Sequence, residues 1–292
     1  MKKVVILGCE NSHADTFLGF IANDKNYADL EVMGVYSHDD LSMEKLASKY
    51  GVKPMKCYDE AVGQVDGVIV TARHGDNHRK YAEPYLRKDL AVFIDKPFTV
   101  SEEDALTFLR KAKEIGAKVC GGSFCRYDPL VQTLRADVIA EANGKTLGGY
   151  VRCPISLSNP NGGFFFYAQH LVEIVGEIFG RYPRAVRAKR YTRSVGVTFI
   201  YNDFEVAGLY SEEYYGCYYA MRSAADVDQG GSIILGSGNP APKIEFNEFY
   251  KMLKGDKQEV SWKDLAAPVF VLNAIDRAMK SGEEETVGEV NI

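Results

Sequence analysis

Short apolar runs alternate with helical patterns along the first part of the chain. The strand-like runs cover 4–7, 30–36, 65–70, 91–94 and 118–122. Helical patterns follow them over 14–22, over 43–50, up to residue 86 and from residue 101 onward. Strands that alternate with helices in this way are typical of a parallel sheet covered by helices. The pattern therefore predicts an α/β domain with a doubly wound parallel sheet over residues 1–122.

The pattern changes after Gly122. Longer stretches rich in β-branched and aromatic residues cover 147–156, 185–191, 195–201, 205–211, 214–221 and 231–235. Turn-rich segments separate them, and helical patterns are confined to 130–142, 167–178 and 262–281. This arrangement predicts an α+β second domain over 123–292, built on a large, mainly antiparallel open sheet.

Composition narrows the class of protein. A net charge of −5 and a pI near 5.7 argue against nucleic acid or an anionic membrane as the main partner. Apolar runs stay far below the roughly 20 residues of a membrane span. The six cysteines are scattered and form no Cys-x-x-Cys pair, so neither a metal site nor a disulfide framework is expected. We therefore expect a reduced, cytoplasmic protein.

The run 91–94 ends in Asp95, Lys96 and Pro97. Ligands bind at the carboxyl ends of strands in open α/β sheets. A lysine at that edge is a candidate proton donor or acceptor, because burial lowers its pKa. The proline lacks an N–H and stops the strand. Taken alone, the tripeptide favours a plain turn that leaves Lys96 in solvent.

The loop after the first strand lies where a dinucleotide-binding fold keeps its glycine fingerprint. Gly8 is in place, but Glu10 and His13 occupy the second and third glycine positions. Asn11 and Ser12 complete the loop and are also good helix caps. The candidate cofactor-binding residues of this loop are Gly8, Glu10, Asn11 and Ser12.

The next two strand ends supply further candidates. Ser37 and His38 stand where an acid usually selects NAD, and small polar plus basic residues there favour NADP. Asp39 follows directly and supports NAD instead, so NAD or NADP remains open with NADP slightly favoured. Thr71, His74 and His78 follow the third strand and either line the nicotinamide ribose or have structural roles.

Three motifs together resemble one family. They are Asp95-Lys96-Pro97, the segment Gly122–Pro129 that contains Arg126-Tyr127-Asp128-Pro129, and the run from Gly162 through His170 to Glu173. Across residues 1–290, the chain resembles the glucose-fructose oxidoreductase, inositol dehydrogenase and rhizopine catabolism (Gfo/Idh/MocA) family. The resemblance implies a Rossmann-type first domain that binds NAD or NADP, with Asp95 and Lys96 among the residues at the cofactor.

The resemblance also implies roles in catalysis. Lys96 would hold a substrate hydroxyl, His170 would accept its proton, and Glu173 would orient the imidazole or contact another hydroxyl. The implied reaction is hydride transfer between the cofactor and a hydroxyl carbon of a sugar, inositol or related polyol. Arg126, Asn161 and Tyr167 are the candidate substrate contacts.

Two departures from the family pattern keep a second function open. Phe166 stands where the family has an aspartate, and Ala168 replaces a glycine. With Glu10 and His13, they favour the alternative of a non-catalytic regulator that binds a nucleotide or metabolite on the same scaffold.

Association between copies is also expected. The tyrosines of 214–219 and the resemblance both favour a homodimer or homotetramer formed through the second sheet.

Overall fold

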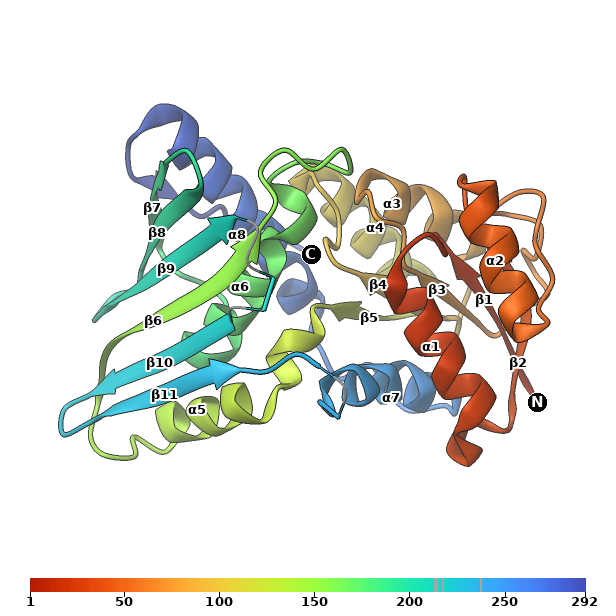
Figure 1. Cartoon of the computed structure of the whole chain (residues 1–292), viewed down its shortest axis with the longest axis horizontal. Helices are drawn as coiled ribbons and strands as arrows, with labels where there is room; N and C mark the ends of the chain where they lie inside the picture. The colour runs from red at the N-terminus through yellow and green to blue at the C-terminus, as the bar shows by residue number, and fades with distance from the viewer. Residues whose placement is uncertain (213–214, 217, 237) are drawn as a thin grey trace.

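The computed structural model describes residues 1–212, 215–216, 218–236 and 238–292. Its two sheets lie side by side, as Figure 1 shows. The first sheet ends at Gly122, which is where the sequence pattern changes. A parallel α/β unit followed by a mainly antiparallel sheet confirms the predicted fold class.

The first sheet contains five parallel strands in the order β2-β1-β3-β4-β5. These strands are β1 (Lys2–Leu7), β2 (Leu30–Tyr36), β3 (Gly67–Val70), β4 (Ala91–Asp95) and β5 (Lys118–Gly122). The connecting helices are α1 (Ser12–Asn23), α2 (Asp40–Tyr50), α3 (Asp76–Ala82) and α4 (Glu102–Ile115). Asn11, Asp39 and Ser101 cap α1, α2 and α4 by accepting hydrogen bonds from backbone N–H groups.

The second sheet contains seven strands in the order β11-β10-β6-β9-β8-β7-β12. The strands are β6 (Thr146–Ile155), β7 (Ala185–Arg190), β8 (Ser194–Ile200), β9 (Glu205–Glu212), β10 (Tyr218–Ala224), β11 (Asp228–Ile233) and β12 (Glu285–Thr286). Only the pairing of β6 with β9 is parallel among the strands described. Of the strand predicted over 214–221, Tyr214 and Cys217 lie outside the described residues. The short strand β12 was not predicted.

Helices cover one face of the second sheet. They are α5 (Pro129–Ile139), α6 (Phe165–Phe179) and α8 (Trp262–Ser281). The buried residues of α6 pack with those of β6, β8 and β9 in a common core. Because α6 begins close to the end of β4 and β5, it brings side chains of the second domain to the edge of the first sheet.

The predicted division into 1–122 and 123–292 needs one correction. Helix α7 (Ala241–Leu253) follows the second sheet in sequence but packs on the first, beneath β4 and β5 in Figure 1. The ring of Phe246 stacks on Phe17 at 5.3 Å, and Phe249 lies 6.4 Å from Phe93. Helices α1 and α2 contribute to the same core, and α7 covers the part of this face over β4 and β5.

Helix α8 also joins the two domains. Leu265, Val269 and Phe270 belong to the core on the other face of the first sheet. Further along the same helix, Leu272 and Ile275 belong to the core of the second sheet. The two sheets are therefore fixed relative to each other by a shared helix.

Two further expectations concern the whole chain. Within the described ranges, no helix is both long and apolar enough to cross a membrane. Five described cysteines carry free thiols: Cys9, Cys57, Cys120, Cys125 and Cys153. Cys217 lies outside the described residues.

Candidate active site at the edge of the parallel sheet

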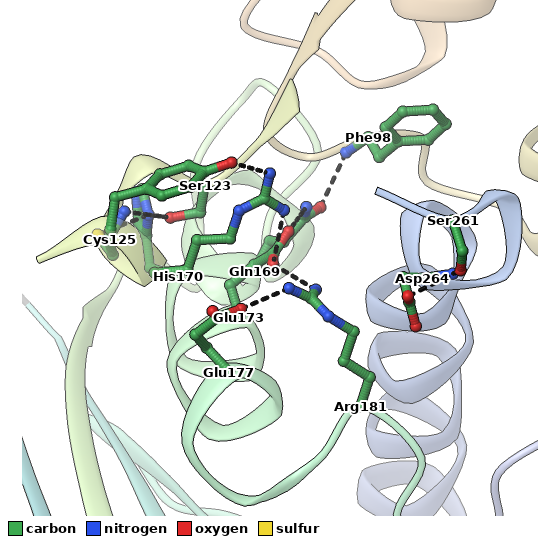
Figure 2. Close-up of polar contacts among 12 residues, drawn as sticks. Phe98, Ser123, Cys125, Gln169, His170, Glu173, Glu177, Arg181, Ser261 and Asp264 are labelled. Carbon is green, nitrogen blue, oxygen red and sulfur yellow. Dashed lines mark hydrogen bonds and ion pairs between the residues drawn. The ribbon is translucent and has the colours of Figure 1, made fainter. Parts of the chain in front are cut away.

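The five parallel strands end at one edge of the first sheet, and the segments that follow them hold most of the candidate residues. Helix α6 meets this edge directly. The backbone N–H of Phe98, just after β4, donates to Oε1 of Gln169 on α6 at 2.8 Å (Figure 2). Gln169 is fully buried, so this bond fixes the segment that follows Lys96 against the second domain.

Lys96 is buried at this junction, with 4% of the residue exposed. Its Nζ lies 4.9 Å from the centre of the Phe166 ring and 5.1 Å from that of Tyr167. Burial lowers the pKa of Lys96, and the neighbouring Asp95 carboxylate partly opposes this effect. The aromatic ring of Phe166 attracts the ammonium group through its π face but brings no negative charge. Lys96 is therefore a buried amine and not a solvent-exposed turn residue.

His170 lies on α6 beside the same tyrosine. Its ring is 4.9 Å from the ring of Tyr167, so Lys96 and His170 contact one shared side chain. Burial, followed by the charges of Lys96 and His13, holds the pKa of His170 well below its usual range. The imidazole is therefore neutral at neutral pH.

Ser123 orients His170. Ser123 Oγ lies 2.6 Å from Nδ1 of His170 and also accepts the backbone N–H of Cys125 at 3.2 Å, as Figure 2 shows. When Nδ1 carries the hydrogen and donates it to Ser123, Nε2 retains its lone pair. Sequence reasoning missed Ser123. The available signal was its place directly after the glycine pair of β5, in the segment that joins the two domains.

The contacts of Glu173 lie at the junction of the two domains. Its carboxylate accepts hydrogen bonds from Gln169 Nε2 at 3.0 Å and from Arg181 Nη1 at 3.1 Å, and Arg126 Nη1 lies 3.5 Å away. Figure 2 shows Glu173 close to Gln169 and Arg181. Glu173 thus neutralises two arginines at the domain junction, and the polar contact of the His170 ring is made by Ser123.

Arg126 lies at the same junction. It is 2% exposed and forms ion pairs with Glu173 and Glu248, with its guanidinium 4.6 Å from the ring of Tyr127. These partners use the charge of Arg126 inside the protein. It links elements of the two domains, and it also lines a cavity of ≈ 600 Å³.

His13, treated as a departure at sequence level, pairs with the acid of the tripeptide. Its Nδ1 lies 2.8 Å from Oδ2 of Asp95, which also accepts from Asn11 Nδ2 at 3.2 Å. Burial by itself raises the pKa of Asp95, but the charges of His13 and Lys96 outweigh it and hold that pKa below its usual range. Asp95 therefore connects the loop after β1 to Lys96.

The loop after β1 retains the first requirement of a dinucleotide turn. Gly8 has φ +83°, and a β-carbon there would lie 2.2 Å from the backbone nitrogen of Ala72. Only glycine permits this approach. Thr71, fully buried, donates its hydroxyl to the Gly8 carbonyl at 3.0 Å and so fixes the turn. Asn11 caps α1 by accepting the N–H of His13 at 3.2 Å, which is the second of the two roles open to it.

The residues after β2 surround a hollow. Ser37 and His38 line a cavity with a volume of ≈ 470 Å³. Ser37 Oγ donates to Glu10 Oε2 at 2.7 Å, while Asp39 caps α2. The first and second strand ends are therefore joined by a direct hydrogen bond between two predicted cofactor residues. Ser12 lies beside them at the start of α1.

The two histidines after β3 have different surroundings. His78 is fully buried, with Nε2 2.7 Å from the Ala72 carbonyl oxygen and Nδ1 3.3 Å from that of Phe98. Its ring joins the segments that follow β3 and β4, which is the structural role left open for it by the sequence. His74 is partly exposed, and a β-carbon on Gly162 would lie 3.6 Å from its Nε2.

The segment that carries Asn161 therefore reaches the first domain. The N–H of Asn161 donates to Oδ1 of Asn159 at 2.9 Å, which holds the turn before Gly162. This turn and His74 approach each other from the two domains. Asn161 remains a candidate substrate contact at that border.

These features define a two-domain scaffold whose first domain has the fold of dinucleotide-binding proteins. Residues 2–123 match the model described as "Oxidoreductase family, NAD-binding Rossmann fold". This match spans the first sheet and its connecting helices.

Three proteins illustrate the similarity. Glucose-6-phosphate 3-dehydrogenase of Bacillus subtilis (strain 168) is 29% identical over 150 residues, which are 50% of this chain and 41% of that protein. The chain thus matches less than half the length of this relative. A putative myo-inositol dehydrogenase from Sinorhizobium meliloti 1021 has a TM-score of 0.82 at 17% identity, over 99% of this chain and 100% of that one. GenD2 from gentamicin A biosynthesis, in complex with NAD, has a TM-score of 0.82 at 16% identity, over 100% and 97%.

Proposed function

We propose that this protein transfers a hydride between a nicotinamide dinucleotide and a hydroxyl carbon of a sugar, inositol or related polyol. One observation carries the proposal: a buried lysine and a neutral, oriented histidine share Tyr167 at the carboxyl edge of a dinucleotide-binding sheet. The names of the similar proteins, a sugar-phosphate dehydrogenase and an inositol dehydrogenase, support the substrate class.

The residues of the chain have separate tasks in this reaction. Lys96 donates a hydrogen bond to the substrate hydroxyl and stabilises the negative charge that develops on its oxygen. His170 accepts the hydroxyl proton at Nε2, because Nδ1–H is held by Ser123. Tyr167 lies against both groups, and its ring offers an apolar face on which a sugar ring can stack.

The residues at the strand ends fit a dinucleotide in part. The turn at Gly8 has the close backbone approach that such a turn requires, and a hollow lies beside Ser37. Gly8, Asn11, Ser12 and Thr71 would hold the phosphate side, with Lys96 and Asp95 at the nicotinamide end. The bound cofactor supplies the hydride chemistry itself.

The proposal is tested with the purified chain, NAD(H) and NADP(H), and a panel of polyols that includes myo-inositol, scyllo-inositol and glucose 6-phosphate. We expect nucleotide binding in a titration of nicotinamide fluorescence, and oxidation of at least one panel member. Lys96→Met should reduce kcat by at least about 100-fold while nucleotide still binds. Failure to bind either nucleotide at millimolar concentration would overturn the proposal.

The regulatory alternative keeps one specific observation in its favour. Phe166 faces Lys96 where the family pattern has a carboxylate, which removes one candidate group from the reaction. A regulator of this kind would bind the nucleotide with unchanged affinity in the Lys96→Met variant and oxidise no member of the panel. The same titration and panel therefore separate the two functions.

We further infer that copies associate through the second sheet. Helices cover one face of this sheet, and the other face carries the half-buried side chains of Tyr150, Leu209, Tyr219 and Met221. The rings of Tyr150 and Tyr219 lie 6.0 Å apart across neighbouring strands, and Arg152 stands between Leu209 and Tyr219 in the register, so this face is aromatic and apolar around one arginine. Sedimentation of the wild-type chain and of a Met221→Lys variant tests this: the variant should shift toward the monomer.

A further inference from the structure

Glu10 joins the segments that follow three neighbouring strands. Its Oε2 accepts the hydroxyl hydrogen of Ser37 at 2.7 Å, and its Oε1 accepts the backbone N–H of Arg73 at 3.0 Å. Ser37 follows β2 and Arg73 follows β3, on either side of β1 in the sheet. The strand order changes direction there, and ligands of doubly wound sheets bind in the crevice formed by that change. Glu10 therefore spans the crevice, although it stems from the phosphate loop.

The contacts of Glu10 direct its charge toward the end of β2. In dinucleotide sites, the acid at this strand end accepts hydrogen bonds from the adenosine ribose. Here that position holds Ser37, which is 1% exposed and donates to Glu10. Asp39 does not substitute for it, because its Oδ1 accepts the N–H of Ser42 at 3.2 Å and its Oδ2 accepts the Ser42 hydroxyl at 2.7 Å.

The cavity beside Ser37 suits the adenosine end. Met43, Pro54 and Met55 give it apolar walls, and its volume of ≈ 470 Å³ lies within the usual range for small-ligand sites. Asp40 and Glu44 line it, with Lys56 as the one lysine among its lining residues. Together with Glu10, the local balance is negative. A 2′-phosphate, with a charge of about −1.5 to −2 near neutral pH, is disfavoured in such surroundings.

We propose that Glu10 is the residue that selects the cofactor: it accepts the ribose hydroxyls in place of the usual acid at the end of β2 and excludes a 2′-phosphate. The protein then binds NAD(H) in preference to NADP(H). This inference rests on the proposed function, because it concerns the same dinucleotide site. It also reverses the slight preference for NADP that Ser37 and His38 suggest when they are considered without Glu10.

The test compares NADH and NADPH on the full chain by nicotinamide fluorescence, with calorimetry as a second measurement. We expect the wild-type Kd for NADPH to exceed that for NADH by at least about 30-fold. Glu10→Gln keeps the size of the side chain and removes its charge, so the ratio should fall by about tenfold or more. Glu114→Gln, an exposed position on α4, removes the same charge elsewhere and should leave the ratio unchanged.

The possible results separate the role of Glu10 from the proposed function. Wild-type protein that binds NADPH as tightly as NADH overturns the role of Glu10 while the proposed function stands. The same holds if Glu10→Gln, folded by circular dichroism, keeps the wild-type ratio. Absence of binding by either nucleotide overturns both. The wild-type ratio remains decisive if the variant does not fold.

Discussion

Replacing Glu173 by glutamine separates a structural role from a catalytic one. The carboxylate is 1% exposed and lies against two guanidinium groups, those of Arg181 at 3.1 Å and Arg126 at 3.5 Å. Removing one partner of a buried ion pair costs about 3–5 kcal/mol, because the remaining charge stays buried without compensation. At roughly 2–4 °C per kcal/mol for a chain of this size, Tm should fall by about 6–20 °C.

Thermal unfolding followed by circular dichroism measures this change. Glu177→Gln is the matched control. Glu177 lies on α6, as Glu173 does, and also pairs with Arg181, but its side chain is more exposed. Because its side chain is 11% exposed against 1% for Glu173, the control should lose less than Glu173→Gln. The reasoning is refuted if Glu173→Gln unfolds at the wild-type temperature while kcat falls. That result would return Glu173 to the orienting role that the motif suggested.

Three further predictions concern the site. Ser123→Ala removes the hydrogen bond to His170 and should lower kcat about tenfold with little change in KM, measured by steady-state kinetics; an unchanged kcat would contradict the orienting role. For oxidation, the acid limb of the pH profile of kcat/KM should lie below pH about 6.5, because the lowered pKa of His170 keeps the imidazole neutral. The alkaline limb should begin below pH about 10.4, because burial lowers the pKa of Lys96. Limbs at the ordinary pKa values would contradict the effect of burial. Gly8→Ala should cost about 2–4 kcal/mol in urea unfolding because of its positive φ and the contact with Ala72, whereas unchanged stability would show that the turn relaxes.

The local pattern was sufficient for the first domain. The apolar runs, their spacing and the caps at Asp39 and Ser101 depend on neighbours within a turn or two, so the strands and helices of 1–122 could be predicted closely. Helix α7 could not be placed in the same way. Its residues Phe246 and Phe249 show an apolar face, but no local feature says which of two sheets will bury it.

For the candidate site, the sequence likewise indicates where a residue lies along the sheet edge but not which side chain it contacts. A polar residue that follows a strand must lie at the sheet edge, so Gly8 and Lys96 were found from their positions alone. The partner of each side chain depends on segments that meet only after packing. His170 and Ser123 are 47 residues apart, and Glu10 and Ser37 are 27 residues apart.

The sequence by itself determined the class of fold and the place of Lys96 at the carboxyl edge of the first sheet, because both follow from periodicity and from the order of elements. The tertiary structure decided which groups act on one another. In the folded chain Glu173 pairs with two arginines, His170 contacts Ser123, and Glu10 hydrogen-bonds to Ser37 at the end of β2. The physical reason is that hydrogen bonds and ion pairs act over a few ångströms, and only packing decides which distant side chains come that close.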